Sequence, residues 1–189
     1  MQMPKTEKPL SETASRILDV AEHMARQGGY YAFSFRDIAA EIGIKSASIH
    51  YHFPTKEALG EALVTRYTDR FLGALGRLDE ATPMESLEQY VAAYRQALIE
   101  QDLMCLCGMF GAEIARLPDP VARRTREFFE RNLVWLETVF RAAGAANPEA
   151  RAGETIARLE GAMILARSMN DMDLFQRVTA DLPAQALRE

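Results

Sequence analysis

Residues 33–59 read F-S-F-R-D-I-A-A-E-I-G-I-K-S-A-S-I-H-Y-H-F-P-T-K-E-A-L, and this stretch decides the fold of the first third of the chain. Within it, two short segments with apolar residues at helical spacing meet at Gly43. A glycine relieves the tight backbone between two helices that cross steeply, so the stretch predicts a helix-turn-helix. Ser34 and Asp37 have the spacing of a variant capping box at the start of the first helix, and Pro54 closes the second.

The two helices divide their residues between packing and exposure. The apolar residues that can pack the pair together are Ile38, Ala39, Ile42, Ile44 and Ile49. The residues left facing outward on the second helix are Lys45, Ser46, Ala47, Ser48, His50, Tyr51 and His52. In a helix-turn-helix the start of the second helix meets base edges in the major groove, so the pattern predicts double-stranded DNA as a partner.

The rest of the chain also has apolar residues at helical spacing and no useful strand-like alternation. We expect a first helix that begins at Ser11 or Thr13 and stops at residues 28–29, and a fourth that begins at Thr55 and continues to about Asp79. Further helices are expected from Pro83, after Pro120, and over about residues 149–168 and 171–182, with a buried apolar stretch at 103–117. The sequence therefore predicts an all-α fold of about nine helices.

Charge is distributed unevenly over the 189 residues, whose net charge is −5. Residues 1–56 hold seven Lys/Arg and six Asp/Glu, whereas the remainder holds 15 basic and 21 acidic residues. This asymmetry favours a DNA-facing end joined to an acidic body. We therefore expect a DNA-binding domain over residues 1–56, with a flexible tail at 1–10, and an effector-binding and dimerisation domain over residues 57–189.

The sequence predicts a cytoplasmic protein with no membrane partner. No apolar run approaches the roughly 20 residues that a membrane span needs, and the polar first ten residues lack the apolar core of a secretory signal. The two cysteines, Cys105 and Cys107, are one residue apart and cannot staple a fold of this size, which is typical of a reducing compartment.

The chain resembles the TetR family of transcriptional regulators over roughly residues 13–60. The match includes I-L-D-V-A-E-H-M at residues 17–24, the Gly28-Gly29-Tyr30 break, R-D-I-A followed by a glycine, an aromatic run ending in Phe-Pro, and T-K-E-A-L. The later two thirds are similar only in the number and length of the helices. The sequence departs from the family pattern at His50 and His52, where tyrosines are usual, and at Lys45, where a small cap residue is usual.

The resemblance implies a role for each matching residue. Ser34 and Arg36 would approach the DNA backbone, His50 and Tyr51 would contact bases or phosphates, and Lys56 would clamp a phosphate. The residues implied at the groove floor are Lys45, Ser46, Ala47 and Ser48. Ser34 is first of all a helix cap, Phe53 is expected in the core, and His52 is as readily a packing residue as a contact.

Beyond residue 60 the sequence contains no nucleophile elbow, phosphate-binding glycine loop or metal-ligand spacing, so we expect neither an enzyme nor a cofactor. His50 and His52 are two apart on a helix and face different sides, which argues against a shared metal ion. The same region is rich in aromatic residues and methionine, which suit a pocket for a small hydrophobic or aromatic effector. In TetR-like proteins such a pocket lies among helices four to eight. The residues expected to line it are Phe71, Tyr94, Cys107, Phe110 and Trp135, with Glu113 and Arg167 as polar anchors.

A homodimer is expected because the last helices have an apolar stripe and the family pairs its chains through a four-helix interface. The residues predicted at that interface are Ile156, Leu159, Met163, Ala166, Leu174 and Val178. A weakly basic module gains specific affinity when two copies bind successive half-sites, so the operator is expected to be a palindrome.

The sequence thus predicts a ligand-responsive regulator, a repressor by resemblance, that a small effector releases from its operator. Two alternatives remain open. One is a redox or electrophile sensor that acts through Cys105 and Cys107, although no basic residue lies within a turn of either to lower the thiol pKa. The other is a helical small-molecule-binding protein or enzyme without DNA binding. A non-specific architectural DNA protein is disfavoured by the negative net charge.

Overall fold

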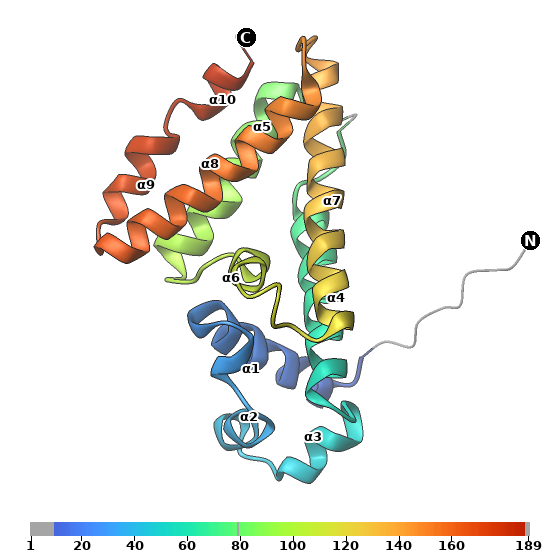
Figure 1. Cartoon of the computed structure of the whole chain (residues 1–189). Helices are drawn as coiled ribbons and strands as arrows, with labels where there is room; N and C mark the ends of the chain where they lie inside the picture. The colour runs from blue at the N-terminus through green and yellow to red at the C-terminus, as the bar shows by residue number, and fades with distance from the viewer. Residues whose placement is uncertain (1–9, 79, 188–189) are drawn as a thin grey trace, which may run out of the picture.

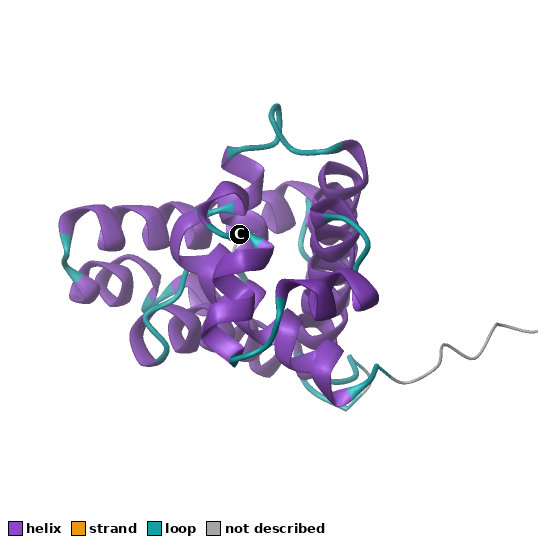
Figure 2. Ribbon diagram, turned by 90° about the horizontal axis from the view of Figure 1, so that it is seen from below, coloured by secondary structure: helices purple, strands orange, loops and turns teal. Residues whose placement is uncertain are grey.

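The computed structural model describes residues 10–78 and 80–187, and there it is helical throughout, with no strand in these ranges (Figures 1 and 2). The elements are α1 (Glu12–Gly28), η1 (Tyr30–Ala32), α2 (Phe35–Ile42), α3 (Ser46–His52), α4 (Lys56–Ala74), α5 (Pro83–Arg95), η2 (Gln96–Glu100), α6 (Leu106–Ala112), α7 (Asp119–Ala142), α8 (Pro148–Met169), α9 (Met172–Thr179) and α10 (Leu182–Ala186). The predicted all-α fold is confirmed. The expected flexible tail falls, except for Leu10, outside the described residues.

Local signals in the sequence set the helix starts in the N-terminal third. The Ser11 side chain accepts a hydrogen bond from the amide of Ala14 at 3.2 Å, which caps α1. At α2 both halves of the Ser34–Asp37 capping box are present. Gly43 ends α2 in the left-handed conformation (φ 71°), which turns the chain into α3.

The fourth helix is shorter than the sequence predicts. It begins after the predicted cap, Thr55, but it ends at Ala74 and does not continue to Asp79, which lies outside the described residues. The chain turns at Gly76, whose φ of 69° is left-handed. The apolar spacing persists through Leu75 and Leu78 because both side chains pack on the core from the loop. Apolar periodicity alone therefore predicted a helix that is too long.

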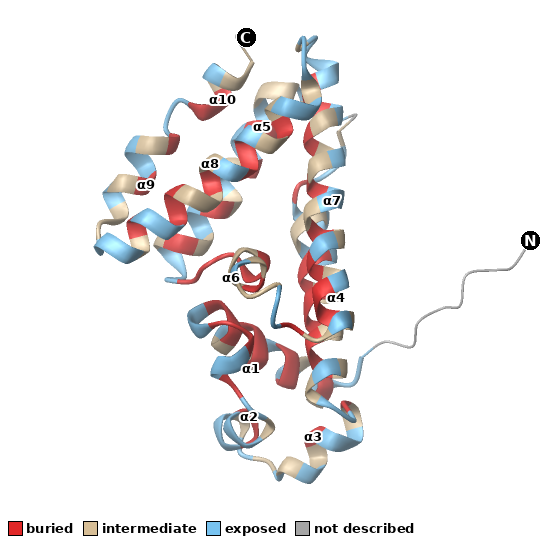
Figure 3. Cartoon of the chain, in the orientation of Figure 1, coloured by how far each residue is buried: buried red, intermediate tan, exposed pale blue. Residues whose placement is uncertain are grey.

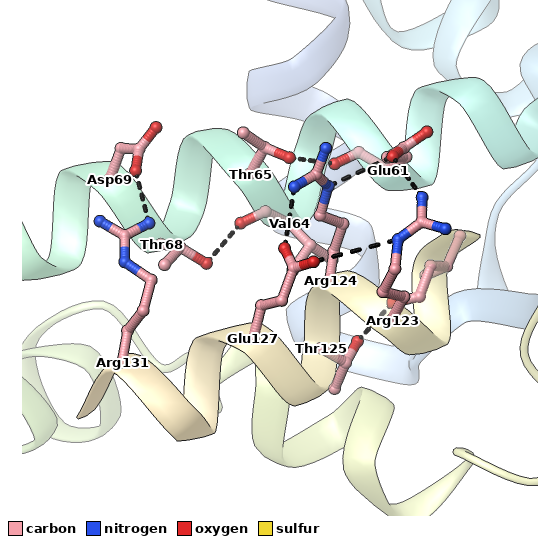
Figure 4. A network of polar contacts seen from close by, with 11 residues as sticks. Glu61, Val64, Thr65, Thr68, Asp69, Arg123, Arg124, Thr125, Glu127 and Arg131 are labelled. Carbon is pink, nitrogen blue, oxygen red and sulfur yellow. Dashed lines mark hydrogen bonds and ion pairs between the residues drawn. The ribbon is translucent and has the colours of Figure 1, made fainter. Parts of the chain in front are cut away.

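Helix α4 leaves the N-terminal module and runs alongside α7 into the larger helical body (Figure 1). Charged pairs on the surface fix how the two helices lie against each other (Figure 4). Glu61 accepts from Arg123 Nη2 at 3.1 Å and from Arg124 Nε at 3.2 Å, and Arg131 pairs with Asp69 at 2.8 Å. Exposed pairs of this kind contribute about 0–1 kcal/mol each, so the buried apolar contacts stabilise the α4–α7 packing and the charges orient it.

The buried side chains form one continuous core that joins the N-terminal module to the larger body, as the red inner faces in Figure 3 show. The core includes a polar contact that is satisfied internally, where Tyr90 donates to Asn132 Oδ1 at 2.9 Å and Asn132 donates to the Phe128 carbonyl at 2.7 Å. Since the core has no break at residue 56, movement of one part strains the other.

Gly60 lies where α4 passes η1 and α7, and it allows a first test of this packing. A Cβ at this position would lie 2.8 Å from Tyr30 Cε2 and 2.9 Å from Val121 Cγ2. We expect Gly60→Ala to lower the free energy of unfolding by about 1–2 kcal/mol, because overpacking outweighs the better helix propensity of alanine. Thermal unfolding should show a loss of several degrees, at about 2–4 °C per kcal/mol.

Gly73 on the same helix is the matched control, because nothing lies within 4 Å of its would-be Cβ. Gly73→Ala should stabilise the protein by about 0.5–1 kcal/mol. Equal melting temperatures for the two variants would mean that α4 does not approach Tyr30 and Val121 this closely.

Candidate nucleic-acid interface and the adjoining cavity

Helix α3 lies at the outer end of the N-terminal module and presents a polar face to solvent (Figures 1 and 3). Tyr51 is 86% exposed and contacts only the ring of His52, edge to face, among the ring contacts of the described residues. Ile49 and Phe53 are buried on the opposite side, which holds the helix to the module. An exposed tyrosine on a short rigid helix is free to contact DNA, because its side chain is not used in packing the fold.

Two neighbours contact the exposed ring of His50. Its Nδ1 lies 3.3 Å from the Pro54 carbonyl oxygen, and its ring meets Phe35 edge to face at 4.7 Å. In the neutral tautomer that donates from Nδ1 to this carbonyl, Nε2 is left as an acceptor. In a major groove such an acceptor suits the exocyclic amine of adenine or cytosine.

The other residues predicted to contact DNA lie around this face. Lys45, Ala47 and Arg36 are exposed, and Ser46 and Ser48 are half-buried. The Ser34 hydroxyl donates to Asp37 Oδ2 at 2.6 Å, and this hydrogen bond is the main cause that lowers the pKa of the Asp37 carboxyl. With its proton committed to the cap, Ser34 is a helix cap in this structure and not an available donor to phosphate.

Lys56 requires a correction. Its Nζ donates to the Phe33 carbonyl at 2.5 Å and lies 4.4 Å from the ring centre of Phe33 and 4.7 Å from that of Tyr30. Burial lowers the pKa of this lysine, against the opposing charges of Asp37 and Glu113. The ammonium group therefore anchors α4 to η1 through cation–π contacts, and the geometry does not support the predicted phosphate clamp.

Helix α1 is tied to α4 by a charged cluster around Glu22, whose side chain is only 8% exposed. Glu22 Oε2 accepts from Arg66 at 3.3 Å and from Arg70 at 3.1 Å, and its Oε1 lies 3.5 Å from Arg26 Nη1. Arg66 also pairs with Asp19 at 2.9 Å. Three guanidinium groups thus share one buried carboxylate, and the loss of that carboxylate would leave buried positive charge unpaired.

Two further ties connect the N-terminal module to α6. Arg26 Nε donates to the Met104 carbonyl at 2.8 Å, and the Met104 amide donates back to the Arg26 carbonyl at 3.4 Å. At the other end of α6, Glu113 Oε2 accepts from the Tyr30 amide at 2.7 Å. The position of the DNA-facing module therefore depends on α4 and α6.

A cavity of about 210 Å³ opens beside the Glu22 cluster. Its walls come from α1, α4, α5, η2, the segment before α6, and α8. The lining residues are Glu22, Arg26, Tyr67, Arg70, Phe71, Ala74, Ala93, Tyr94, Gln96, Ala97, Gln101, Cys105 and Met163. Part of the wall is a π-helical turn, η2, a feature that is frequent at functional sites.

The structure brings only part of the predicted effector pocket together. Phe71 and Tyr94 line the cavity, whereas Cys107 and Phe110 are fully buried in the core. Trp135 stacks on Tyr90 and faces a separate surface groove. Neither predicted polar anchor reaches the cavity, because Glu113 binds the Tyr30 amide and Arg167 pairs with Asp102 at 2.5 Å.

Glu22 and Arg26 were not predicted as cavity residues. Four positions apart on α1, they have the spacing of an ordinary exposed helix pair, and nothing local indicates that both are buried. The sequence offers only a weak signal: Glu22 and Arg26 each follow a buried alanine, Ala21 or Ala25, and so lie at the edge of the apolar face of α1.

Both cysteines are buried, and their thiols favour the protonated form. Burial is the main cause that raises the pKa of both the Cys105 and Cys107 thiols well above their ordinary value. Cys105 lines the cavity and accepts a weak hydrogen bond from the Tyr67 hydroxyl at 3.7 Å. A redox or electrophile sensor needs an exposed thiol with a lowered pKa, so the structure argues against that alternative.

The predicted dimer interface also requires a correction. Ile156, Leu159, Met163 and Ala166 are buried, because this face of α8 packs into the chain's own core. The two predicted residues on α9, Leu174 and Val178, are half-buried. The opposite face of α8 is exposed instead. It comprises the exposed Ala157, Ile164, Leu165 and Ser168 and the half-buried Gly161.

Within residues 10–78 and 80–187, no helix is long and apolar enough to cross a membrane, and no three His, Cys, Asp or Glu side chains are grouped as metal ligands. The predicted cytoplasmic location stays a prediction.

The fold and the exposed α3 define the chain as a helix-turn-helix regulator. Residues 17–63 match the model of a family described as bacterial regulatory proteins, tetR family. A TetR transcriptional regulator from Legionella pneumophila has a similar structure, with 34% identity, coverage of 94% of this chain and 99% of that chain, and a TM-score of 0.86. One from Agrobacterium tumefaciens is 30% identical over 91% and 96% of the two chains, with a TM-score of 0.85.

Among curated proteins, the chain is 30% identical to the HTH-type transcriptional repressor DhaR of Mycobacterium sp. (strain GP1) over 59% of this chain. The alignments span 60%, 45% and 50% of the first three curated relatives. The chain belongs to the TetR family of transcriptional regulators. This membership confirms the predicted resemblance and the prediction of a regulator, not an enzyme.

Proposed function

We propose that the chain is a homodimeric transcriptional repressor that binds a palindromic operator through α2 and α3 and is released when a small effector enters the cavity beside α1. The first support is α3, which presents Tyr51 and His50 to solvent from a rigid, buried base. A repressor named as such among the relatives, DhaR, favours repression over activation.

The observation that carries ligand control is the shared wall. Glu22 and Arg26 belong to α1, the first helix of the DNA-binding module, and both line the cavity. A ligand in the cavity contacts the DNA-binding module directly. It can therefore bind two positions of α1 with different affinities, and no long chain of residues is needed to couple the cavity to the module. Because α1 packs on both α2 and α3, a shift of α1 relative to α4 would carry α2 and α3 with it.

The exposed face of α8 is the surface we propose for the dimer. Ile164 and Leu165 are about half exposed, at 52% and 50%, and nothing lies within 4 Å of a would-be Cβ at Gly161. Small and apolar residues allow two helices to approach closely across a two-fold axis. The dimer would hold two α3 helices at a fixed spacing for successive half-sites.

The test is footprinting on the DNA that flanks the chain's own coding region. The purified protein should protect a palindrome or near-palindrome, and protection should weaken as salt rises, since binding releases counterions from phosphate. Protection that is independent of sequence, or none at all, would contradict the proposal.

A further inference from the structure

We propose that the cavity binds a small apolar or aromatic carboxylic acid, whose carboxylate takes the place of Glu22 on Arg70 and Arg26 and so shifts α1 relative to α4. This inference rests on the proposed function for its regulatory consequence, but the binding site and its chemistry do not depend on it.

The inner wall sets the body of the ligand. Phe71 meets Tyr94 edge to face at 5.9 Å, and Met163 and three alanines complete the apolar lining. Aromatic edges and a polarizable thioether suit a ring or a short alkyl chain. The volume of about 210 Å³ is below the roughly 300 Å³ at which sites for drug-sized ligands begin, so the ligand has on the order of ten non-hydrogen atoms.

The outer wall sets the charge of the ligand. Arg26 and Arg70 both line the cavity, and the one acidic residue among the described lining residues, Glu22, is already shared with Arg66. The Arg70 side chain is 61% exposed and makes one ion pair, to Glu22, so it can turn toward a ligand at little cost. A guanidinium fork prefers a planar carboxylate, which it binds in a bidentate manner.

Arg26 supplies the second donor. Its Nε is committed to the Met104 carbonyl and its Nη1 lies near Glu22 and Gln101, but no described residue accepts a hydrogen bond from its Nη2. The guanidinium is nearly buried and lies over the Tyr67 ring at 5.7 Å. A carboxylate at the mouth of the cavity would accept a hydrogen bond from Arg26 Nη2 and balance the charge of the guanidinium groups. A neutral amide could accept the hydrogen bond but would not balance the charge.

The same contact explains how a ligand would act on DNA binding. The ion pair from Arg70 to Glu22 is one of the two by which Glu22 joins α1 to α4. A ligand carboxylate competes with Glu22 for Arg70 while it binds Arg26, which is also on α1, so the acid binds best when α1 has shifted enough to withdraw Glu22 from Arg70. By linkage, the ligand then favours the arrangement of α1–α3 that differs from the one shown here.

Titration calorimetry on the full chain without DNA tests the ligand class, with phenylacetate and hexanoate as probes and their primary amides as neutral controls of the same shape. We expect at least one acid to bind and its amide to bind at least tenfold more weakly. Equal affinity for acid and amide, or no binding of either acid at millimolar concentration, would overturn the proposal.

Variants locate the charge contact. Arg70→Gln should weaken binding of the acid at least tenfold, whereas Arg131→Gln, which breaks the α4–α7 surface pair with Asp69, should leave it unchanged. Glu22→Gln should bind the acid severalfold more tightly, because it removes the competing charge. An unchanged affinity in Arg70→Gln, in a variant that melts like the parent, would also overturn the proposal.

Operator binding separates this inference from the proposed function. If the unliganded chain protects an operator and saturating acid does not weaken protection, the release mechanism is contradicted and the proposed repressor function is supported. If the acid binds as described but no operator is protected, the carboxylic-acid site is supported and the proposed repressor function is contradicted.

Discussion

Tyr51→Ala is expected to remove operator protection at protein concentrations that fully protect with the parent chain. Tyr51 is 86% exposed on α3 and contributes almost nothing to packing, so its loss acts on the DNA contact and not on the fold. A contact to a base or phosphate is worth roughly 1–3 kcal/mol, and a dimer loses two of them. The affinity should therefore fall by at least about 30-fold. Footprint titrations on the operator measure the effect.

Two controls accompany this variant. Tyr51→Phe keeps the ring and removes only the hydroxyl, so its affinity separates stacking and apolar contact from hydrogen bonding. Val134→Ala removes an exposed apolar side chain of α7, far along the sequence from α3, and should bind the operator like the parent. If Tyr51→Ala melts normally and still protects the operator fully, α3 is not the helix that enters the groove.

The N-terminal third was predictable because its signals are local. Ser34 with Asp37 and the left-handed Gly43 determine their own hydrogen bonds and dihedral angles, whatever packs around them. The alternation of buried Ile49 with exposed Tyr51 follows from helical geometry once α3 is placed. The same features carry the family resemblance, so fold and family were both within reach of the sequence.

Residues whose roles depend on distant partners were not predictable. The Lys56 ammonium group lies over the rings of Tyr30 and Phe33, which are more than 20 positions away in the sequence. The motif match at Lys56 therefore predicted the role usual in the family and could not show these contacts. Glu22 and Arg26 line a cavity only because α4 and the segment before α6 fold over them. Burial of this kind is a tertiary property that no local spacing records.

Helix α8 shows a third reason for a wrong prediction. Apolar residues lie on both of its faces, so periodicity could not say which face meets α7 and which meets solvent. The stripe with the larger residues, including Leu159 and Met163, was assigned to the dimer and in fact packs the core. The smaller stripe around Gly161 and Leu165 was left exposed, and it gives the dimer proposal a sharp test.

Leu165→Glu is expected to convert the proposed dimer to monomers. An isologous interface contains every substitution twice, so two carboxylates would be desolvated near the two-fold axis without partners. Uncompensated buried charge costs several kcal/mol, and at least about 4 kcal/mol for the two copies raises the dimer Kd by about a thousandfold. Sedimentation velocity at micromolar concentration measures the dissociation, and operator affinity should fall with it because the two α3 helices are no longer linked.

Val134→Glu is the matched control for the dimer, since Val134 is 62% exposed on α7 and lies outside the α8 face. It places the same charge on another exposed apolar position, and the variant should remain a dimer that binds the operator. Because neither side chain is part of the buried core, both variants should melt as folded helical proteins. A dimer that survives Leu165→Glu but dissociates in Val134→Glu would move the interface to α7, and the half-site spacing expected from an α8 pairing would then be wrong.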